Sequence, residues 1–552
     1  MNSPYEINRT LACPLLALAQ AQLLERRNPG GPADRDRFPR RLAFTLGLLL
    51  AATMAAAGAT KNILLVIADD YGMDSHSLYN TNLAASRPPT PNINALAARG
   101  VRFANAYAYP TCSPTRSAIL TGRYGFRTGV TQVLDTAGAQ GIYTNEFTLP
   151  EVLSATHRCG SFGKWHLGGT APAPNSVGGW SQFSGSLQGA LGQNATNFYT
   201  WAKISNGVMR LNYSGYATTD NVNDALTWLG AQGTNRWFLW LAFNAPHTPY
   251  HLPPTNLCPR YAGLSGTAMD IQQNPRNYFE ASVEAMDTEL GRLLAGINTN
   301  ETTIFFLGDN GTPPRVIQPP YNITGRAKDT LYEGGVRVPF IAAGPDIVSP
   351  GRTHDAVVHV VDLFATILEL AGVNASNALP RSLPNDSRSL GSILRHQTFA
   401  PAEPAVLLED PDNLPAGTLT GRAARQGQFK LIEWDTTADA FYDLSADPLE
   451  GTNLLTLTLT PTQQSSLDVL RAKLAAWANV PVIYNQARSG GTFTADAGWF
   501  VNPNFSLWRN PDPATTNWTR LTNATTQNLG PAIRLTDPQP PAGKAFYRVG
   551  NQ

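Results

Sequence analysis

Short continuous runs of apolar residues alternate with helical patterns through the first two thirds of the chain. The runs are Asn62 to Ala68, Trp237 to Phe243 and Thr303 to Leu307. Apolar runs of this length, rich in branched and aromatic residues, predict strands that are buried on both faces of a parallel sheet. Helical spacing is found in the intervening segments Pro91 to Arg99, Asp220 to Leu229 and Tyr278 to Leu294. This alternation predicts an α/β fold in which helices cover both faces of a large, mostly parallel sheet.

Polar residues directly follow two of these predicted strands. Asp69 and Asp70 come after the first run, and Asp309 and Asn310 come after the third. In open α/β sheets the functional residues gather at the carboxyl ends of the strands. We therefore expect a ligand site there, although an Asp pair after a strand and an Asp-Asn-Gly turn are also common as caps and turn formers.

The last third of the chain has a different pattern of predicted secondary structure. Short strands are predicted at Ala405 to Leu408, Phe429 to Trp434 and Ala440 to Leu444, followed by a helix from Thr462 to Ala478. Beyond Val480 the chain is rich in Asn, Thr and Pro and reads as a β-rich extension, whose aromatic residues we expect to pack in a core rather than to contact carbohydrate. The predicted division is a leader over 1–59, a catalytic α/β domain over 60–400, a small-sheet subdomain over 401–479 and the extension over 480–552.

Composition narrows the function classes. The 552 residues include 42% hydrophobic residues, enough for a sizeable core, and 41 basic against 40 acidic residues, a net charge of +1. This balance argues against a nucleic-acid binder, which would carry a basic footprint. Four cysteines in such a long chain exclude a disulfide scaffold.

The beginning of the chain has the features of an export signal. Arg40 and Arg41 precede an apolar run from Leu42 to Ala59 that ends in small residues, which favours a cleaved secretory signal with a mature N-terminus near Thr60. The alternative is a short membrane anchor, but the run is rich in Ala, Thr and Gly. We expect an exported protein, periplasmic or extracellular, with no stable membrane insertion after cleavage.

Export bears on the cysteines. Cys13 would be lost with the leader, and Cys159 and Cys258 would either pair as a disulfide in an oxidising compartment or remain two buried thiols. Cys112 lies in a motif of its own.

The segment Cys112-Ser-Pro-Thr-Arg116, followed by Thr121-Gly-Arg123, resembles the C-x-P-x-R and T-G-R signature of the sulfatase family. The resemblance continues, in order, through Thr90 to Phe103, Phe162 to Gly168, Ala245 to Pro249, Gly308 to Gly311, Lys328 with Tyr332 to Pro339, and Asp443 to Pro448. It covers roughly Lys61 to Ala478. It implies an alkaline phosphatase-like α/β fold with a smaller C-terminal antiparallel sheet, and a formylglycine-dependent, arylsulfatase-like enzyme.

The resemblance assigns the nucleophile to Cys112. In this family a maturation enzyme converts the signature cysteine to formylglycine, whose hydrated aldehyde offers two hydroxyls on one carbon. One attacks sulfur, and loss of a proton from the other then expels sulfate. The structural alternative for Cys112 is a small buried residue.

The resemblance also implies a metal site. Asp69, Asp70, Asp309 and Asn310, with the modified Cys112, would hold one Ca²⁺. Their oxygen ligands suit a hard cation, which would act as a Lewis acid on the sulfate.

Cations and histidines complete the implied set. Arg116, Lys164 and Lys328 would surround the anion, and with three carboxylates and one divalent ion they leave a formal charge of +2, which attracts a sulfate monoester. By resemblance, His166 would accept the proton that lets sulfate leave, whereas His247 and Lys328 would protonate the leaving alcohol.

Three functions compete. The first is hydrolysis of sulfate monoesters of sugars or aryl alcohols; the second is phosphomonoester or phosphodiester hydrolysis by the same superfamily scaffold; the third is glycan binding by a dead site. The complete catalytic set argues against the third. Thr115 stands where many members have Ser, and the unmatched segment Tyr250 to Arg276 is where we expect substrate specificity to reside.

Overall fold

The computed structural model describes residues 61–134, 141–142, 146–168, 174–175, 179–189, 191, 198–374, 385–397, 406–410, 420–478, 482–489, 491–498, 505–511, 518–528, 532–541 and 545–551. The predicted leader and Cys13 lie outside the described residues. Within these ranges, no helix combines the length and the apolar character that crossing a bilayer requires.

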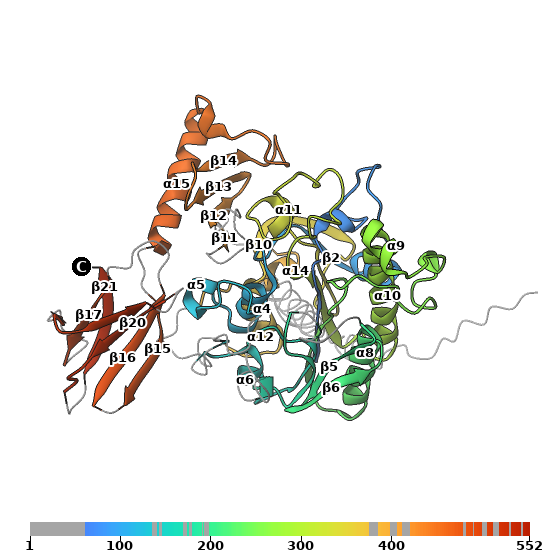
Figure 1. Ribbon diagram of the computed structural model, residues 1–552, viewed down its shortest axis with the longest axis horizontal. Coiled ribbons are helices and arrows are strands. Elements are labelled where there is room, and N and C mark those ends of the chain that lie inside the picture. Colours follow the sequence, from blue (N-terminus) through green and yellow to red (C-terminus); the bar gives the residue numbers. More distant parts are fainter. Residues whose placement is uncertain are drawn as a thin grey trace, which may run out of the picture. The chain divides into compact units, whose positions relative to one another are not determined.

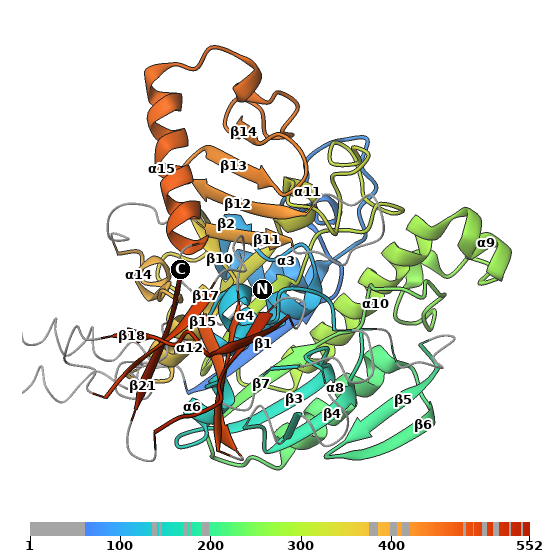
Figure 2. The same ribbon diagram turned by 60° about the vertical axis from the view of Figure 1, so that its left-hand side comes forward.

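One large sheet organises the fold (Figures 1 and 2). Its ten strands lie in the order β10 (Arg352–His359), β2 (Gly100–Tyr107), β9 (Phe340–Ala343), β8 (Thr302–Gly308), β1 (Asn62–Ala68), β7 (Trp237–Ala242), β3 (Arg158–Lys164), β4 (Gln182–Ser186), β5 (Thr200–Ser205) and β6 (Val208–Ser214). The central strands β8, β1, β7, β3 and β4 run parallel to one another, whereas β9, β5 and β6 are antiparallel to their neighbours. The predicted mostly parallel sheet is thus confirmed.

The three apolar runs read from the sequence form three adjacent strands, β8, β1 and β7. Every residue of these strands is buried, because their alternate side chains enter two separate cores. Ile63, Leu65 and Ile67 of β1 face one core, and Leu64 and Val66 face the other. A strand without a solvent face has no polar alternation, which explains why it reads as an unbroken apolar run.

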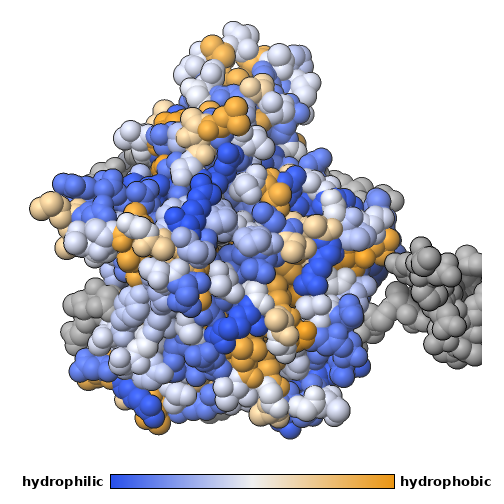
Figure 3. Space-filling view, turned by 90° about the vertical axis from the view of Figure 1, so that its right-hand side faces the viewer, coloured by the Kyte–Doolittle hydropathy of each residue, from blue (hydrophilic) through white to orange (hydrophobic). Residues whose placement is uncertain are grey.

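Helices cover both faces, as predicted. One core is closed by α4 (Cys112–Thr121), α6 (Leu149–Leu153) and α12 (Asp362–Leu370). The other is closed by α3 (Pro91–Ala98), α8 (Ala217–Gly230) and α10 (Pro275–Ala295), the three helices that the spacing predicted. The molecular face in Figure 3 is mostly hydrophilic, with its hydrophobic residues in small patches.

A smaller antiparallel sheet follows, as expected. Its strands lie in the order β11 (Val406–Asp410), β12 (Gly421–Gln426), β13 (Phe429–Trp434) and β14 (Ala440–Asp443), and α15 (Pro461–Ala478) packs on it. The sequence reading missed β12, because Gly-Arg-Ala-Ala-Arg-Gln has no β-branched or aromatic residue. Ala424 and Leu431 face α15, and Ala423 and Ile432 face the other way.

The predicted extension is β-rich. It contains one sheet of β15 (Val482–Ser489), β16 (Thr492–Gly498), β20 (Ala532–Asp537) and β19 (Thr525–Asn528), and another of β18 (Thr519–Arg520), β17 (Phe505–Asn510) and β21 (Phe546–Asn551). Its small core is built from Phe493, Leu507 and Leu535, and Tyr547 stacks on Phe493 with ring centroids 3.7 Å apart. Phe546, by contrast, is 38% exposed, so core packing describes some of its aromatics and not others. The chain divisions at residues 400 and 480 stay predictions.

Cys159 and Cys258 are both buried free thiols. Cys159 belongs to the core that α4 and α12 close, and Cys258 to the core that α8 and α10 close. The large sheet separates these two cores, so the disulfide alternative does not hold.

We therefore expect no bond between these two cysteines in the purified protein. Burial raises the pKa of Cys159 to about 12 and that of Cys258 to about 11, so iodoacetamide should leave both unmodified in the folded state. In denaturant without reductant both should alkylate fully, as peptide mass spectrometry would detect. A reducing agent should leave Tm unchanged; a linked peptide pair would contradict the assignment.

Candidate active site

The predicted site residues gather at the carboxyl ends of four consecutive parallel strands, β8, β1, β7 and β3. Asp309 and Asn310 follow β8, Asp69 and Asp70 follow β1, His247 lies five residues beyond β7, and Lys164 ends β3. Parallel neighbours end at the same edge of the sheet, and Ala68 pairs directly with Gly308. Residues separated by some 240 positions in the sequence thus become neighbours.

The backbone brings the carboxylates together. Asp70 has left-handed backbone torsions (φ 62°), and its amide donates to Asp309 Oδ1 over 3.1 Å. Asn310 Nδ2 donates to Asp70 Oδ1 over 2.8 Å. Asp69, Asp70 and Asp309 are all buried.

Helix α4 supplies Cys112 and Arg116. Cys112 is its first residue, where unpaired backbone amides and the helix dipole favour an anion. Arg116, one turn later, donates to Asp309 Oδ2 through Nη2 over 2.6 Å and through Nε over 3.1 Å. The Thr115 hydroxyl donates to the Asp309 carbonyl over 2.7 Å and accepts from the Tyr109 amide. The threonine at this position therefore anchors the signature to the strand end after β8.

Lys164 joins β3 to this cluster. Its Nζ lies 2.7 Å from Asp69 Oδ2 and 3.3 Å from Cys112 Sγ, and its carbonyl accepts from Arg116 Nη1 over 2.9 Å. The preceding Gly163 has φ 94°, and a Cβ there would lie 1.9 Å from the Ala242 carbonyl oxygen. Only glycine fits this approach of β3 to β7, which sets the position of Lys164.

Lys328 and His247 lie on the other side of Asp70. Lys328 Nζ is 2.5 Å from Asp70 Oδ1, and His247 Nε2 is 3.7 Å from Asp70 Oδ2. Both side chains retain some exposure, 12% and 17%, whereas Lys164 and Arg116 have none. This is the arrangement expected of groups that must reach a substrate.

His166 lies two residues beyond Lys164, on the loop that follows β3. It is buried, has left-handed torsions (φ 54°), and its amide donates to the Leu187 carbonyl. Its proposed role as proton acceptor stays a prediction.

Two oxygens of the cluster fit a bound cation. Asp69 Oδ1 and Asn310 Oδ1 are fully buried and have no hydrogen-bond partner among the residues that the structure describes. This is a costly state for polar atoms unless something else binds them. Donor atoms of Asp69, Cys112 and Asp309 lie within 4.8 Å of one another, as do those of Asp69, Asp70 and His247. The oxygen-rich donor set suits a hard divalent ion.

Electrostatics set the protonation of the cluster. Burial raises the pKa of Asp69 despite the neighbouring Lys164. Burial opposes ionisation of Asp70 as well, but Lys328, His247 and Lys164 outweigh it and hold its pKa below the usual range. Burial raises the pKa of Cys112 to about 12 even though Lys164 and Lys328 counteract it. An unmodified Cys112 is therefore a neutral thiol at physiological pH, a poor nucleophile.

Sequence reasoning missed a supporting layer behind the carboxylates. The buried Asp74 accepts from the Thr312 hydroxyl over 2.5 Å and from the Gln318 amide over 2.9 Å. The Thr312 hydroxyl also accepts from the Gly72 amide, so it ties the loop after β1 to the loop after β8. Their positions in the sequence could have indicated this layer, because Asp74 lies four residues after Asp70 and Thr312 lies two residues after Asn310.

His251, which lies four residues beyond His247, is packed in the interior rather than in the cluster. It is 6% exposed, stacks on Phe198 with centroids 4.1 Å apart, and its Nε2 lies 3.3 Å from the Tyr216 hydroxyl. The surrounding segment forms η2 (Pro259–Tyr261) and α9 (Ala268–Gln273), and its part in specificity stays a prediction.

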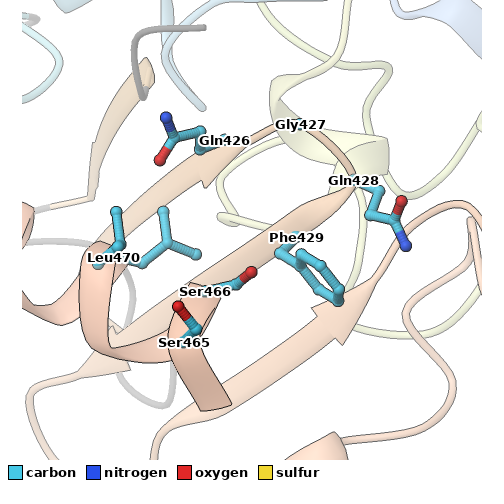
Figure 4. Close-up of a pocket in the computed structure, with 8 residues that line it drawn as sticks. Gln426, Gly427, Gln428, Phe429, Ser465, Ser466 and Leu470 are labelled. Carbon is cyan, nitrogen blue, oxygen red and sulfur yellow. The ribbon is translucent and has the colours of Figure 1, made fainter. Parts of the chain in front are cut away.

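A separate pocket of about 350 Å³ lies between α15 and the turn joining β12 to β13 (Figure 4). Phe429, Ser465, Ser466 and Leu470 surround it, and its lining contains no titratable group. The residues that line it therefore include no acid–base group.

Comparison with known proteins agrees with this geometry. The sulfatase family model matches residues 61–373, and the model described as N-sulphoglucosamine sulphohydrolase, C-terminal, matches residues 326–477. Arylsulfatase A of Homo sapiens is 30% identical over 74% of this chain and 86% of its own length, and a sulfatase of Formosa agariphila is 27% identical over 83% and 96%.

Solved structures show the same fold. Ps i-CgsB superposes with a TM-score of 0.63 at 24% identity, covering 76% of this chain and 92% of its own. BT4656, solved with its substrate D-glucosamine-2-N,6-O-disulfate, gives 0.62 at 19% identity, covering 76% and 98%. The chain therefore belongs to the sulfatase family and is a sulfuric ester hydrolase.

Proposed function

We propose that this protein hydrolyses sulfate monoesters of carbohydrates, or of aryl alcohols, with formylglycine made from Cys112 and one bound Ca²⁺. The observation that carries the proposal is the position of Cys112 at the start of α4, with Lys164 Nζ 3.3 Å from its sulfur and unpaired carboxylate and amide oxygens beside it. Relatives include N-acetylgalactosamine-6-sulfatase of Rattus norvegicus, 29% identical over 60% of this chain, which favours a sulfated sugar.

The nucleophile needs chemistry that a buried neutral thiol lacks. Conversion of Cys112 to formylglycine would supply a hydrated aldehyde. One of its hydroxyls would attack sulfur, and the alcohol would leave as its bond to sulfur breaks. The second hydroxyl would then lose its proton, so that sulfate leaves from the same carbon and the aldehyde is restored. A formylglycine-generating enzyme is therefore the partner that we propose for maturation of the unfolded signature segment.

Asp69, Asp70, Asp309 and Asn310 would hold the calcium ion, together with the modified Cys112. When bound, the ion supplies Lewis-acid polarisation of the sulfate and neutralises the carboxylates. We propose Asp69 Oδ1 and Asn310 Oδ1 as two of its ligands, because these buried oxygens have no hydrogen-bond partner in the described part of the chain.

The remaining side chains divide the work between the two ends of the ester. Lys164 and Arg116, fully buried and fixed by Asp69 and Asp309, would stabilise charge around the sulfate at no reorganisation cost. His247 and Lys328, partly exposed beside Asp70, would protonate the leaving oxygen, and His166 would accept the proton released as sulfate departs.

The site also bears on the runner-up, a phosphoester hydrolase. A phosphate monoester near neutral pH carries more negative charge than a sulfate ester, so a site with three cations and a metal would bind it tightly. Turnover depends on what is stabilised in the transition state rather than in the ground state. We therefore expect phosphate to act as an inhibitor. Export of the chain and an accessory role for residues 480–552 remain further proposals.

The nucleophile is tested by mass spectrometry. The Cys112 peptide of active protein should have lost sulfur and two hydrogens and gained one oxygen. Cys112→Ala should lower kcat by at least about 1,000-fold while Tm changes little, because the substitution removes little volume. Cys159→Ala, an equal change at another buried cysteine, should keep its activity. An unmodified thiol in fully active enzyme would refute the proposal.

The metal is tested by calorimetry and chelation. Ca²⁺ should stabilise the fold by mass action, raising the free energy of unfolding by about 2.7 kcal/mol at one hundred times its Kd and raising Tm with it. EDTA should abolish activity until Ca²⁺ returns. Asp69→Asn should remove the Ca²⁺-dependent shift and lower activity at least about 100-fold. Asp220→Asn, at a second buried Asp–Lys pair with Lys203, should keep both. Active enzyme without any divalent ion would show the ligand assignment to be wrong.

Sulfate preference is tested with matched 4-nitrophenyl esters. We expect kcat/KM for the sulfate to exceed that for the phosphate at least about tenfold, with inorganic phosphate acting as an inhibitor. If both aryl esters react poorly, matched esters of one sugar alcohol should be compared. A clear preference for phosphate in either pair would move the protein to the runner-up class.

A further inference from the structure

The segment that carries Lys328 is held on its catalytic side by backbone contacts. The Lys328 amide donates to the Thr312 carbonyl and the Asp329 amide to the Pro110 carbonyl, each over 3.1 Å. Asp329 has left-handed torsions (φ 68°). These bonds fix the middle of the segment but leave its two ends, at Arg326 and Glu333, to be held by other parts of the chain.

Helix α11 (Glu333–Val336) packs against this segment backbone to backbone. A Cβ at Gly334 would lie 2.2 Å from the Arg326 carbonyl oxygen, and a Cβ at Gly335 would lie 2.1 Å from that of Thr330. No side chain fits between the two. Any shift of α11 must therefore be passed to the segment that carries Lys328.

The loop that follows β14 of the small C-terminal sheet contacts both ends of the segment, and Figures 1 and 2 show α11 beside that sheet. Arg326 Nη1 donates to the carbonyls of Leu449 and Glu450, each over 2.7 Å. The Glu333 amide donates to Glu450 Oε2, also over 2.7 Å. One residue, Glu450, thus contacts the entrance and the exit of the segment at once.

Glu450 is itself strongly constrained. It has left-handed torsions (φ 59°), which a non-glycine residue adopts at a cost, and it is 1% exposed. Its carboxylate lies 2.8 Å from Lys430 Nζ, which is also 3.0 Å from Glu333 Oε1. The Tyr107 hydroxyl, from β2 of the large sheet, donates to the Glu333 carboxylate over 3.0 Å. A buried network with this many bonds has one arrangement rather than several.

We propose that Glu450, in the loop that follows β14, is a positioning residue for Lys328, so that the part of the chain that carries the small C-terminal sheet supports the active site at the large sheet. The inference rests on the proposed role of Lys328 as a donor to the leaving oxygen. The match of the C-terminal family model, which begins at residue 326 rather than at the small sheet, agrees with treating this segment and the sheet as one unit.

The role has a signature that a merely structural defect lacks. Protonation of the leaving oxygen matters little for 4-nitrophenyl sulfate, whose phenolate leaves readily, and matters much for phenyl sulfate, whose phenolate is more basic. Misplacement of Lys328 should therefore lower kcat/KM for phenyl sulfate selectively. A general loss of folded or metal-loaded enzyme lowers the apparent kcat/KM for both substrates by the same factor.

The main experiment measures both substrates with the calcium-loaded, mature enzyme. Glu450→Ala should lower kcat/KM at least about tenfold for phenyl sulfate and less than about threefold for 4-nitrophenyl sulfate. Glu450→Gln, which keeps an acceptor for the Glu333 amide, should lie closer to the parent. Glu433→Ala is the control, because Glu433 forms an ion pair with Arg422 inside the small sheet. It should leave kcat/KM unchanged for both substrates.

A second variant guards against misfolding. Arg326→Ala removes the other contact to Glu450 from a half-buried side chain and should show the same selective loss, whereas Arg422→Ala should not. In a Lys328→Ala background, Glu450→Ala should cost less than about twofold more, because both changes act on one group.

The outcomes separate the two proposals. If Lys328→Ala lowers kcat/KM equally for both substrates, the proposed role of Lys328 as a donor to the leaving oxygen is wrong. Suppose instead that Lys328→Ala lowers kcat/KM selectively for phenyl sulfate. If Glu450→Ala and Arg326→Ala then lower kcat/KM equally for both substrates, or for neither, the positioning role is overturned. Additive losses in the double variant would overturn it as well.

Discussion

Three carboxylates buried at one edge of the sheet form the constraint on which the rest of this structure depends. Asp69, Asp70 and Asp309 converge because their strands are parallel neighbours, and buried carboxylates without partners are strongly unfavourable. The fold therefore directs a cation to each of them: Lys164 to Asp69, Lys328 to Asp70 and Arg116 to Asp309. These pairs contain most of the side chains that we propose for the active site.

The three cations balance the formal charge of the three carboxylates, but they differ in exposure. Lys164 and Arg116 are fully buried, whereas Lys328 keeps some exposure. Asp69 Oδ1 and Asn310 Oδ1 have no hydrogen-bond partner among the described residues. A divalent ion held by such oxygens would add two positive charges to a balanced cluster, and a bound anion would offset them.

Buried carboxylates near the small C-terminal sheet are also paired with a cation. Lys430 lies between Glu333 and Glu450, all three buried, and this network reaches the Lys328 segment through Glu450. Because removing one partner from a buried ion pair leaves an uncompensated charge, the small sheet and the catalytic sheet are not independent. This coupling gives a physical reason why the segment that carries Lys328, between β8 and β9, is held in place by the part of the chain that carries the small sheet.

The sequence by itself determined the central strands, their flanking helices and the motifs that carry the chemistry. Strands β8, β1 and β7 and helices α3, α8 and α10 were readable because burial on two faces, or on one face of a helix, leaves a local periodic record in the chain. The resemblance of the segment around Cys112 to the sulfatase signature pointed to the family and named every proposed ligand and cation. The supporting residues Asp74 and Thr312 were not named.

Only the tertiary structure decided which remote residues meet. The antiparallel insertion of β9, the strand β12 with its small and charged residues, the separation of Cys159 from Cys258 by the sheet, and the contact of Glu450 with Glu333 leave no periodic record in the chain. Strand order and the pairing of buried charges depend on the packing of segments that lie far apart in the sequence. Local patterns report how deeply a residue is buried, whereas its partner is set by the fold as a whole.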